Sequence, residues 1–331
     1  MRIVAALGGN ALLRRGEPLD VETQRHNVRL AAAALAPLTH DHELIITHGN
    51  GPQVGLLALQ AADSSIPAYP LDILGAETEG MIGYLLEQEL ANALGHDRIA
   101  TVLTRTLVRA DDPAFTQPTK FIGPMFCQAD AEKMAEKRGW AIARDGQCWR
   151  RVVPPPEPIG VMELGAIKHL IGGRFLVICA GGGGIPVRRT AAGAHEGVEA
   201  VVDKDLVAAI VALALGADCL LLLTDVPGVF DAWGSGNARM IRAVHPDELA
   251  RFAFPAGSMG PKVAAARRFA ISGRGAACIG ALSDAARIIG GSAGTRVCTD
   301  HSSVSFATDT DGAPTPRHHS MDVYEADPAT S

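Results

Sequence analysis

The sequence is poor in aromatic side chains and has no long apolar run, and these absences already exclude several classes of protein. Phe, Trp and Tyr make up 5% of the 331 residues, so the core must consist mainly of Ala, Val, Leu and Ile. The longest apolar run, Leu206 to Ala217, is too short to cross a bilayer. Nothing that resembles a signal peptide precedes the strand-like run Ile3–Leu7. We therefore expect a soluble, cytoplasmic protein with no membrane partner.

A basic stripe is also missing. The formal net charge is −6, but residues 300–331 hold six acids and one base, which leaves 30 acids and 29 bases in the body of the chain. A body so evenly balanced argues against nucleic acid as a partner. The acidic segment 300–331 has no apolar periodicity and is rich in Ser, Thr, Asp and Pro, so we expect a disordered tail there.

No two of the six cysteines form a C-x-x-C pair. Three of them lie in strand-like apolar runs, at Cys179, Cys219 and Cys278. Buried reduced thiols are the favoured interpretation over a metal site or a disulfide.

Glycine, by contrast, is abundant, at 36 of 331 residues, or about 11% against a usual value near 7%. Strand-like runs such as Arg2–Leu7, Glu43–Thr47, Ile99–Thr104, Phe175–Ala180 and Cys219–Thr224 alternate with helix-like runs. This order predicts an α/β fold with a mostly parallel sheet and helices on both faces. The segment 111–158 breaks the pattern with Pro, charge and Trp, and we expect it to project from the sheet as an insertion with a short helix (Ala129–Arg138) and a hairpin around Asp145–Gly146.

Three glycine-rich turns follow strands directly. They contain Gly8, Gly9 and Asn10; Gly49, Asn50 and Gly51; and Gly181, Gly182 and Gly183 with Gly184. Loops at the carboxyl ends of parallel strands line the ligand crevice of an open α/β sheet, and their backbone amides can bind anions. One such turn alone is more often structural, but three together favour an anion site.

Neither common nucleotide fingerprint is present. The G-x-x-x-x-G-K-[ST] loop is absent, and the G-x-G-x-x-G pattern fails because Val54 and Pro186 stand at its last position. Any nucleotide is therefore bound in another way.

Three lysines stand beside residues that break regular structure, at Lys120, Lys204 and Lys262. Ammonium groups suit the neutralisation of a transferred phosphoryl group, although each lysine alone would more often be a solvated surface residue. Asp203 and Asp205 flank Lys204. Asp205 could cap a helix that begins at Leu206, or the pair could orient a lysine or a metal.

Two weaker candidates remain. Thr224, Asp225 and Val226 end a strand-like run, so their loop either faces the crevice or is a plain β-turn. His48 beside Gly49 could be a base, but an orienting or packing histidine is the favoured interpretation.

Several strings are specific enough to carry a family resemblance. These are Ala6-Leu7-Gly8-Gly9-Asn10-Ala11, His48-Gly49-Asn50-Gly51-Pro52-Gln53-Val54-Gly55, Pro118-Thr119-Lys120, Cys179-Ala180-Gly181-Gly182-Gly183-Gly184-Ile185-Pro186-Val187, Val202-Asp203-Lys204-Asp205 and Gly257-Ser258-Met259-Gly260-Pro261-Lys262. They resemble carbamate kinases of the amino-acid kinase superfamily, in order and without large gaps from Ile3 to about Thr299.

The resemblance implies the amino-acid kinase fold, an αβα sandwich with an open, mainly parallel sheet and a protruding lid at about 111–158. It implies an acceptor part (1–200), a nucleotide part (201–299), a homodimer, and reversible phosphoryl transfer between MgATP and carbamate. Members of the family often catalyse this reaction in reverse, which makes ATP from carbamoyl phosphate in arginine or purine-type nitrogen catabolism. Mg²⁺ would come with the nucleotide, with no metal site on the protein.

The resemblance also implies roles for single residues. The catalytic group would comprise Lys120, Lys204, Asp205 and Lys262. Carbamate and the transferred phosphoryl would meet Gly8, Gly9, Asn10, Gly49, Asn50, Gly51, Gly181, Gly182 and Gly183. The nucleotide would contact Thr224, Asp225, Val226, Met259 and Gly260.

At two positions, Ala6 and Phe121, related sequences often carry a different residue. Ala6 stands where many superfamily relatives have a lysine, as it does in carbamate kinases, so the charge must come from elsewhere, such as Lys204. Phe121 stands where the family usually has proline after the lid lysine, which leaves Lys120 in place.

The alternatives to a carbamate kinase are a kinase of another small carboxylic acid on the same fold, or a non-catalytic binding or regulatory homologue.

Overall fold

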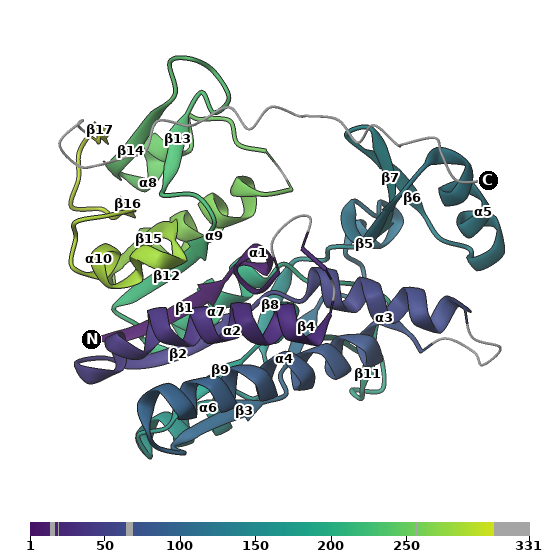
Figure 1. Ribbon diagram of the computed structural model, residues 1–331, viewed down its shortest axis with the longest axis horizontal. Helices are drawn as coiled ribbons and strands as arrows, with labels where there is room; N and C mark the ends of the chain where they lie inside the picture. The colour runs from purple at the N-terminus through teal and green to yellow at the C-terminus, as the bar shows by residue number, and fades with distance from the viewer. Residues whose placement is uncertain (14–16, 19, 64–68, 256, 308–331) are drawn as a thin grey trace.

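The computed structural model describes residues 1–13, 17–18, 20–63, 69–255 and 257–307, with the side chains of 10–11 and 61–63 left aside. Its largest sheet has ten strands (Figure 1). Nine form a continuous path: β13 (Val229–Asp231), β14 (Arg239–Val244), β16 (Thr295–Val297), β15 (Ala276–Ala281), β12 (Cys219–Thr224), β1 (Arg2–Leu7), β2 (Glu43–His48), β9 (Leu176–Cys179) and β3 (Ile99–Val102). The central strands are parallel, as the sequence predicted.

Strand β1 shows how the sheet is buried on both faces. Its side chains alternate, because successive residues of a strand point to opposite faces. Ile3, Ala5 and Leu7 pack into one apolar cluster, whereas Val4 and Ala6 pack into the other. All five are fully buried, so the chain forms helix, sheet and helix layers.

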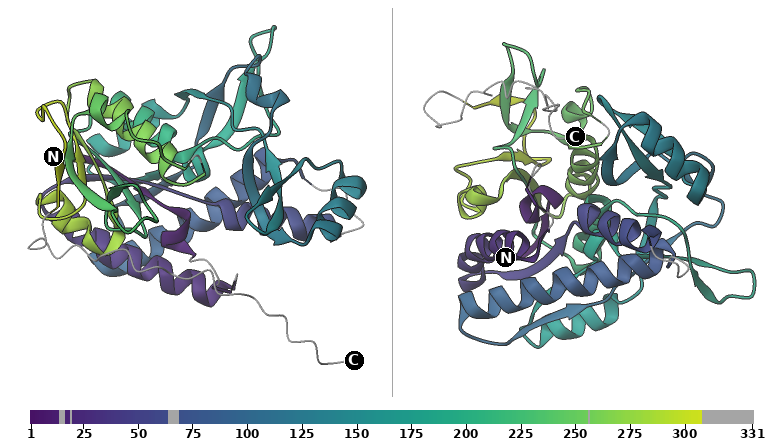
Figure 2. Two further views of the ribbon diagram at one scale, coloured as in Figure 1. Left: turned by 90° about the horizontal axis from the view of Figure 1, so that it is seen from above. Right: turned by 45° about the vertical axis from the view of Figure 1, so that its right-hand side comes forward.

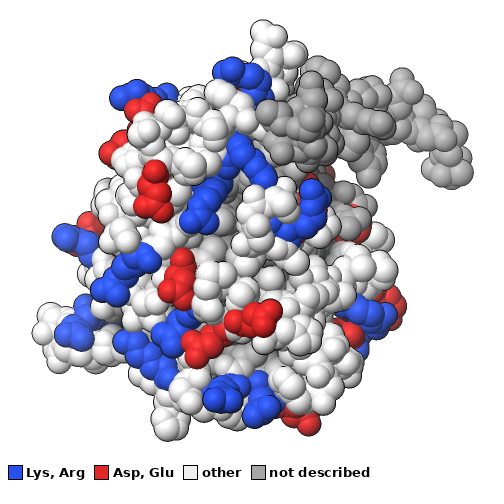
Figure 3. Space-filling view, turned by 90° about the vertical axis from the view of Figure 1, so that its left-hand side faces the viewer, with Lys and Arg blue, Asp and Glu red and all other residues white. Residues whose placement is uncertain are grey.

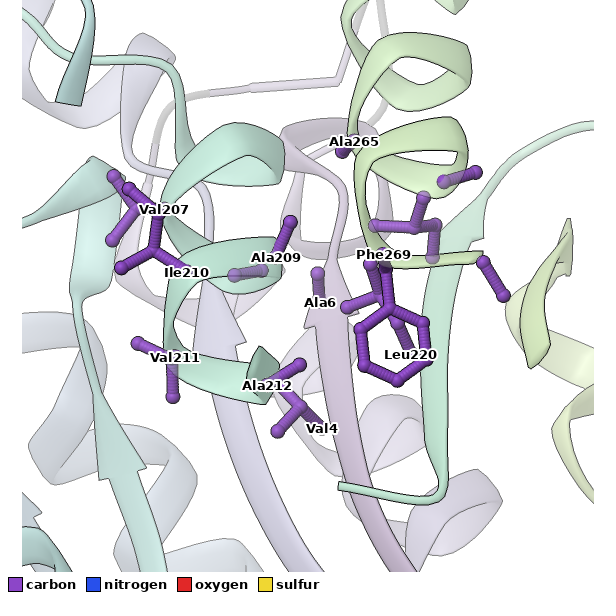
Figure 4. Close-up of a cluster of buried hydrophobic side chains, with 14 of the residues drawn as sticks. Val4, Ala6, Val207, Ala209, Ile210, Val211, Ala212, Leu220, Ala265 and Phe269 are labelled. Atoms are coloured by element: carbon purple, nitrogen blue, oxygen red, sulfur yellow. The ribbon is translucent and has the colours of Figure 1, made fainter. Parts of the chain in front are cut away.

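On the Val4 face lie α6 (Leu164–Gly172), α7 (Lys204–Leu215) and α9 (Met259–Ile271). Figure 4 shows α7 and α9 over β1 and β12, with Phe269 as the one aromatic ring among small side chains such as Ala209 and Ala212. Small residues let α7 approach the sheet closely, which suits a core with few aromatics. The helix ends at Gly216, whose φ of 63° is left-handed.

The opposite face is covered by α2 (Val21–Leu35), α4 (Leu71–Leu94) and the short α10 (Ala285–Ile289). Asp20 caps α2 by accepting a hydrogen bond from the Thr23 amide at 2.7 Å. Helix α4 runs under β2, β9 and β3 and carries four fully or nearly fully buried residues, Ile82, Leu85, Leu86 and Leu90, toward the sheet. The predicted αβα sandwich is therefore confirmed.

The predicted insertion does project from the body (Figures 1 and 2). It is a three-stranded sheet, β5 (Lys120–Phe126), β7 (Cys148–Val153) and β6 (Ile142–Asp145), with α5 (Gln128–Arg138) packed beside it. We call this unit the lid. Strand β5 of the lid packs against α3 (Gly51–Asp63). Arg151 in β7 forms an ion pair of 2.9 Å with Glu199 of the body.

A second small sheet lies at the base of the lid and was not predicted. Its order is β11 (His195–Gly197), β10 (Ile185–Arg189), β4 (Arg105–Val108) and β8 (Pro158–Val161). Pro158, the last residue of the predicted insertion, therefore already belongs to the body.

The end of the chain differs in part from the prediction. Ser305 and Phe306 form β17, which pairs with β14, so residues 300–307 belong to the folded structure rather than to a disordered tail. The rest of that segment, 308–331, lies outside the described residues.

All six cysteines are free, and Cys179, Cys219 and Cys278 are buried, which confirms the predicted reduced thiols. Among the described residues, no helix is long and apolar enough to cross a membrane. Figure 3 shows basic and acidic side chains interspersed over one face.

Candidate active site

A cavity of about 750 Å³ lies at the carboxyl ends of β1, β2 and β12, between the lid and the C-terminal part of the chain. Most residues predicted for the site line it: Gly8, Gly9, Gly49, Asn50, Gly51, Lys120, Gly182, Lys204, Asp205, Thr224, Asp225, Val226, Met259 and Lys262. Residues far apart in the sequence thus meet in one place, as the rule for parallel sheets requires. The side chain of Asn10 is not described, so its predicted contact lies outside the described residues.

The turns after β1 and β2 are packed backbone against backbone. The Gly49 amide donates to the Leu7 carbonyl at 3.0 Å, and the Gly8 amide donates to the Leu223 carbonyl at 3.0 Å. A Cβ atom at residue 49 would lie 2.9 Å from the Gly9 amide nitrogen, so only glycine fits there. Helix α3 begins at Gly51, and its first helical hydrogen bond runs from the Val54 amide to the Asn50 carbonyl. Pro52 has no N–H, so the Gly51 and Gln53 amides are the donors of this first turn that can bind an anion.

The third glycine turn contributes less to the wall than predicted. Among its residues only Gly182 lines the cavity. Gly181 and Gly183 lie beneath it, where Gly181 is held by Glu79 and a Cβ at residue 183 would lie 2.6 Å from the Val202 carbonyl oxygen. These two glycines support the turn and do not reach the cavity.

Two lysines meet on one buried carboxylate. Lys204 Nζ lies 2.5 Å from Asp205 Oδ1, and Lys262 Nζ lies 3.2 Å from Asp205 Oδ2. The exposed fractions are 11% for Lys204, 12% for Lys262 and 5% for Asp205. Charged groups this deeply buried need partners of opposite charge. The carboxylate is the partner of both ammonium groups, and the two ammonium groups are its partners. The carboxylate therefore fixes where the two ammonium groups stand.

The start of α7 differs from the sequence prediction by two residues. Asp203, not Asp205, caps the helix: its Oδ1 accepts from the amides of Asp205 at 2.9 Å and Leu206 at 3.3 Å. The other oxygen of Asp203 lies 3.3 Å from Lys120 Nζ, which also donates to the Val202 carbonyl at 3.1 Å. The lid lysine is thus attached to the body beside the other two lysines.

Burial and charge act against each other on these groups. Burial alone would raise the pKa of Asp205, but Lys204 and Lys262 lower it to about 2. Burial lowers the pKa of Lys204, and the charge of Asp205 opposes that change. Asp205 is therefore ionised at neutral pH.

The C-terminal end of the cavity has an apolar wall that sequence reasoning missed. Phe230 and Trp233 meet edge to face at 5.1 Å, and Phe254 and Pro255 line the same cavity. In a chain with so few aromatics, the close spacing of Phe230 in β13 and Trp233 just after it was the available signal. Gly260, predicted to contact nucleotide, does not line the cavity: its amide donates to the Pro255 carbonyl at 2.9 Å and holds the loop before α9.

His48 packs beneath the cavity and is absent from its wall. It is fully buried, burial lowers its pKa to about 4, and its Nδ1 lies 3.2 Å from the Gly49 carbonyl. The imidazole is therefore neutral at neutral pH. This agrees with the packing or orienting role favoured from the sequence.

The sequence is similar to those of known kinases over most of its length. The model of the amino acid kinase family matches residues 1–280. The carbamate kinase of Rhizobium meliloti is 49% identical over 310 residues, which span 92% of this chain and 96% of that protein. The carbamate kinase of Thermococcus kodakarensis is 44% identical over 311 residues, 89% of this chain and 98% of that protein.

A solved structure agrees. Carbamate kinase from Giardia lamblia bound to AMP-PNP superposes with a TM-score of 0.82 at 38% identity and covers 90% of this chain and 98% of its own. The chain is a kinase that belongs to the carbamate kinases of the amino acid kinase family.

Proposed function

We propose that the cavity transfers a phosphoryl group between carbamoyl phosphate and ADP, with the three lysines around the transferred group. The observation that carries this proposal is the convergence of Lys120, Lys204 and Lys262 from β5, α7 and α9 on a cavity floored by glycine turns. A transferred phosphoryl carries charge on its oxygens, and fixed cations beside it stabilise the transition state. Two aspartates keep the cations in place before substrate enters.

No general base is needed for this reaction. Carbamate is already an anion, so in the ATP-consuming direction its oxygen can attack without losing a proton. Catalysis then depends on holding the two substrates in line and on the lysine charges. We assign the orientation of the carbamate and phosphoryl oxygens to the amides of Gly9 and Gly51, because both residues line the cavity and the Gly49 amide is already bonded to the Leu7 carbonyl.

We place the nucleotide at the C-terminal end, between Thr224–Val226 and Met259, with its base toward Phe230 and Trp233. Aromatic rings bind a planar base by stacking. The relative from Giardia lamblia is described as bound to AMP-PNP, which supports a nucleotide in this cavity. The two-part division, with acceptor residues in 1–200 and nucleotide residues in 201–299, remains part of this proposal.

The side chains of the cavity are compatible with Mg²⁺ that enters bound to the nucleotide. Both oxygens of Asp205 are taken by lysines, and those of Asp203 by Lys120 and the helix amides. In the described part of the chain, no group of three or more His, Cys, Asp or Glu side chains could hold a metal ion. Mg²⁺ commonly keeps several waters and binds substrate phosphates, where it supplies charge neutralisation.

In the cell we expect the reaction to run toward ATP. Carbamoyl phosphate is a mixed anhydride of two acids, so its phosphoryl group is a good donor to ADP. The supply would be nitrogen catabolism of the arginine or purine type, and the enzyme would work as a cytoplasmic homodimer, as the family resemblance implies.

The test is ATP formation from carbamoyl phosphate, ADP and Mg²⁺. The parent should make ATP rapidly, and Lys204→Ala should lose at least 100-fold in kcat, as is typical when one transition-state contact is removed. Lys168→Ala is the matched control, since Lys168 is exposed on α6 and is absent from the cavity wall. A folded parent that makes no ATP would contradict the proposal, and a panel of small carboxylates with ATP would then test the alternative acceptors.

A further inference from the structure

Two consecutive residues of α4 touch two different glycine turns from below. Asn50 in the turn after β2 donates from Nδ2 to Thr78 Oγ1 at 2.9 Å. The Gly181 amide in the turn after β9 donates to Glu79 Oε1, also at 2.9 Å. Thr78 is 0% exposed and Glu79 is 1% exposed, so these are buried contacts from which water is excluded. The cavity lies on the other side of both turns.

The two turns also fill each other's space. The amide of Asn50 occupies the volume that a Cβ atom at residue 182 would need. The ring of His48 and the side chain of Glu79 both lie within 3 Å of the place of a Cβ at residue 181. A shift of either turn would therefore displace Asn50 or Gly182, both of which line the cavity.

A left-handed residue shows that the third turn is held under constraint. Ala180 has φ 51° and ψ 39°, a conformation that residues with a Cβ rarely adopt. Its own amide donates to Thr104 Oγ1 at 3.0 Å, and the next amide, that of Gly181, is held by Glu79. Glu79 Oε2 also accepts from the Thr104 amide at 3.2 Å. One carboxyl group thus joins the ends of β3 and β9 and keeps the turn in this shape.

We propose that Thr78 and Glu79 are positioning residues that fix the turn His48–Gly51 against the turn Ala180–Gly184, and so place Asn50 and Gly182 in the cavity. Neither residue lines the cavity, so neither touches substrate. The kinetic readout of this inference rests on the proposed function, but the positioning itself does not.

Glu79 also makes this placement sensitive to pH. Burial raises the pKa of Glu79 to about 8, against the opposing hydrogen bonds from Thr104 and Gly181. The groups that face it or its neighbours are neutral His48 on β2, the Cys179 thiol on β9, Glu163 before α6 and Lys204 on α7. Near pH 7 the carboxyl is therefore neutral, and above pH 8 it adds a negative charge below a site that binds anions.

The experiment compares four substitutions at these two positions. Glu79→Gln keeps the shape of the side chain without its ionisation, and Glu79→Ala removes both. Thr78→Val removes the hydroxyl at constant shape, and Thr78→Ser restores it. Glu77→Gln, on the exposed face of the same helix, is the matched control. For each variant, kcat and the KM for carbamoyl phosphate are measured from pH 6.5 to 9.

We expect Glu79→Gln to raise KM severalfold at pH 7, because its side-chain amide can accept from only one of the Gly181 and Thr104 amides, and Glu79→Ala, which loses both hydrogen bonds, to raise KM about tenfold. In the parent, KM should rise severalfold between pH 7 and 9, and in Glu79→Gln this rise should be much smaller. Thr78→Val should raise KM severalfold and Thr78→Ser should restore it. A Glu79→Gln profile identical to that of the parent, or a Thr78→Val enzyme with unchanged KM, would overturn the proposal.

A second measurement needs no catalysis. Between pH 6.5 and 8 the folded parent keeps a proton on Glu79 that the unfolded chain has lost, so its urea midpoint should fall relative to that of Glu79→Gln as pH rises. A difference between the two midpoints that stays constant across this range would contradict the inference. An inactive parent that still shows the expected midpoint difference would contradict only the proposed function.

Discussion

The two oxygens of the Asp205 carboxylate are divided between two lysines, with Lys204 on Oδ1 at 2.5 Å and Lys262 on Oδ2 at 3.2 Å. The aspartate lies in the first turn of α7, whereas Lys262 comes from the first turn of α9. One anion therefore positions cations from two helices. Because all three groups are nearly buried, removal of the anion leaves two positive charges close together with little water around them.

The first prediction concerns this carboxylate. Asp205→Asn should lower the free energy of unfolding by about 3 kcal/mol, since breaking a buried ion pair by removing one partner leaves an uncompensated charge. It should also lower kcat by at least 100-fold, because the lysines lose their fixed positions. Urea unfolding and the ATP-forming assay measure the two effects.

Asp203→Asn is the matched control on the same helix. Asparagine caps helices about as well as aspartate, so the hydrogen bonds to the amides of Asp205 and Leu206 should persist. Only the partly exposed ion pair between Asp203 and Lys120 is weakened, and we expect a loss of less than about 1 kcal/mol in the free energy of unfolding. Equal stability losses in the two variants would contradict the prediction that the buried Asp205 carboxylate stabilises the fold more than the Asp203 carboxylate does.

The second prediction follows from buried His48. Burial lowers its pKa to about 4 from an ordinary value of 6.5. As pH falls below 6.5 the unfolded chain takes up a proton that the folded protein refuses, so stability is lost progressively down to about pH 4. At about 1.4 kcal/mol per pKa unit the loss reaches about 3 kcal/mol. His48→Gln should remove this loss.

The protonation of Glu79 has the opposite effect on stability over part of this range. Because its folded-state pKa is raised to about 8, it adds to the free energy of unfolding as pH falls. Between pH 4.5 and 6.5 the two effects oppose each other in the parent. His48→Gln should therefore gain stability over the parent as pH falls from 6.5 to 4.5, measured by urea unfolding at fixed ionic strength. His26→Gln, at an exposed position of α2, should follow the parent, and a parallel course for His48→Gln would contradict the prediction.

The glycine turns and the lysines could be found from the sequence because their pattern is local. Gly8, Gly49 and Gly182 each follow a strand-like run, and the geometry of a parallel sheet then brings the ends of those strands together. The layered fold followed from the same alternation of strands and helices. Local pattern also has limits. Either Asp203 or Asp205 could cap a helix by sequence alone, and the structure shows that Asp203 caps α7.

Glu79 had no comparable signal. It is one of five acids in a long helix, with Asp72, Glu77, Glu87 and Glu89, and spacing alone does not tell which of them is buried against the turns that follow β3 and β9. Strands β10 and β11 were missed because Arg188, Arg189, His195 and Glu196 give them little apolar alternation. Residues 305–306 were assigned to a tail because two residues are too few to show a strand period.

The third prediction separates the lysines. Lys262→Ala should lower kcat by roughly 100-fold or more with a smaller effect on KM, because its charge acts on the transferred group. Lys120→Ala should mainly raise the KM for carbamoyl phosphate, because this residue joins the lid to the body at Asp203 and Val202. Lys133→Ala, an exposed lysine of the same lid, should match the parent. Equal kcat losses in Lys120→Ala and Lys262→Ala would show that the two lysines do the same work.

The fourth prediction tests how the lid is seated. Gly55 in α3 faces Gly123 in β5 so closely that a Cβ at residue 55 would overlap the backbone of Gly123. Alanine normally stabilises a helix interior by about 0.5–1 kcal/mol relative to glycine. In Gly55→Ala that gain should be exceeded by the clash, because backbone cannot move aside as a flexible side chain can. The lid should shift from α3, which would raise KM and speed proteolysis in the lid near Lys120.

Gly80→Ala provides the comparison, since Gly80 is also inside a helix and nothing lies within 4 Å of its Cβ position. This variant should gain about 0.5–1 kcal/mol and keep the kinetics and cleavage pattern of the parent. Carbamoyl phosphate and ADP should slow cleavage near Lys120 in the parent and in Gly80→Ala, because they hold the lid against the body, and should protect Gly55→Ala less. The same cleavage rate in all three proteins, with and without ligands, would mean that the contact between Gly55 and Gly123 does not govern the lid.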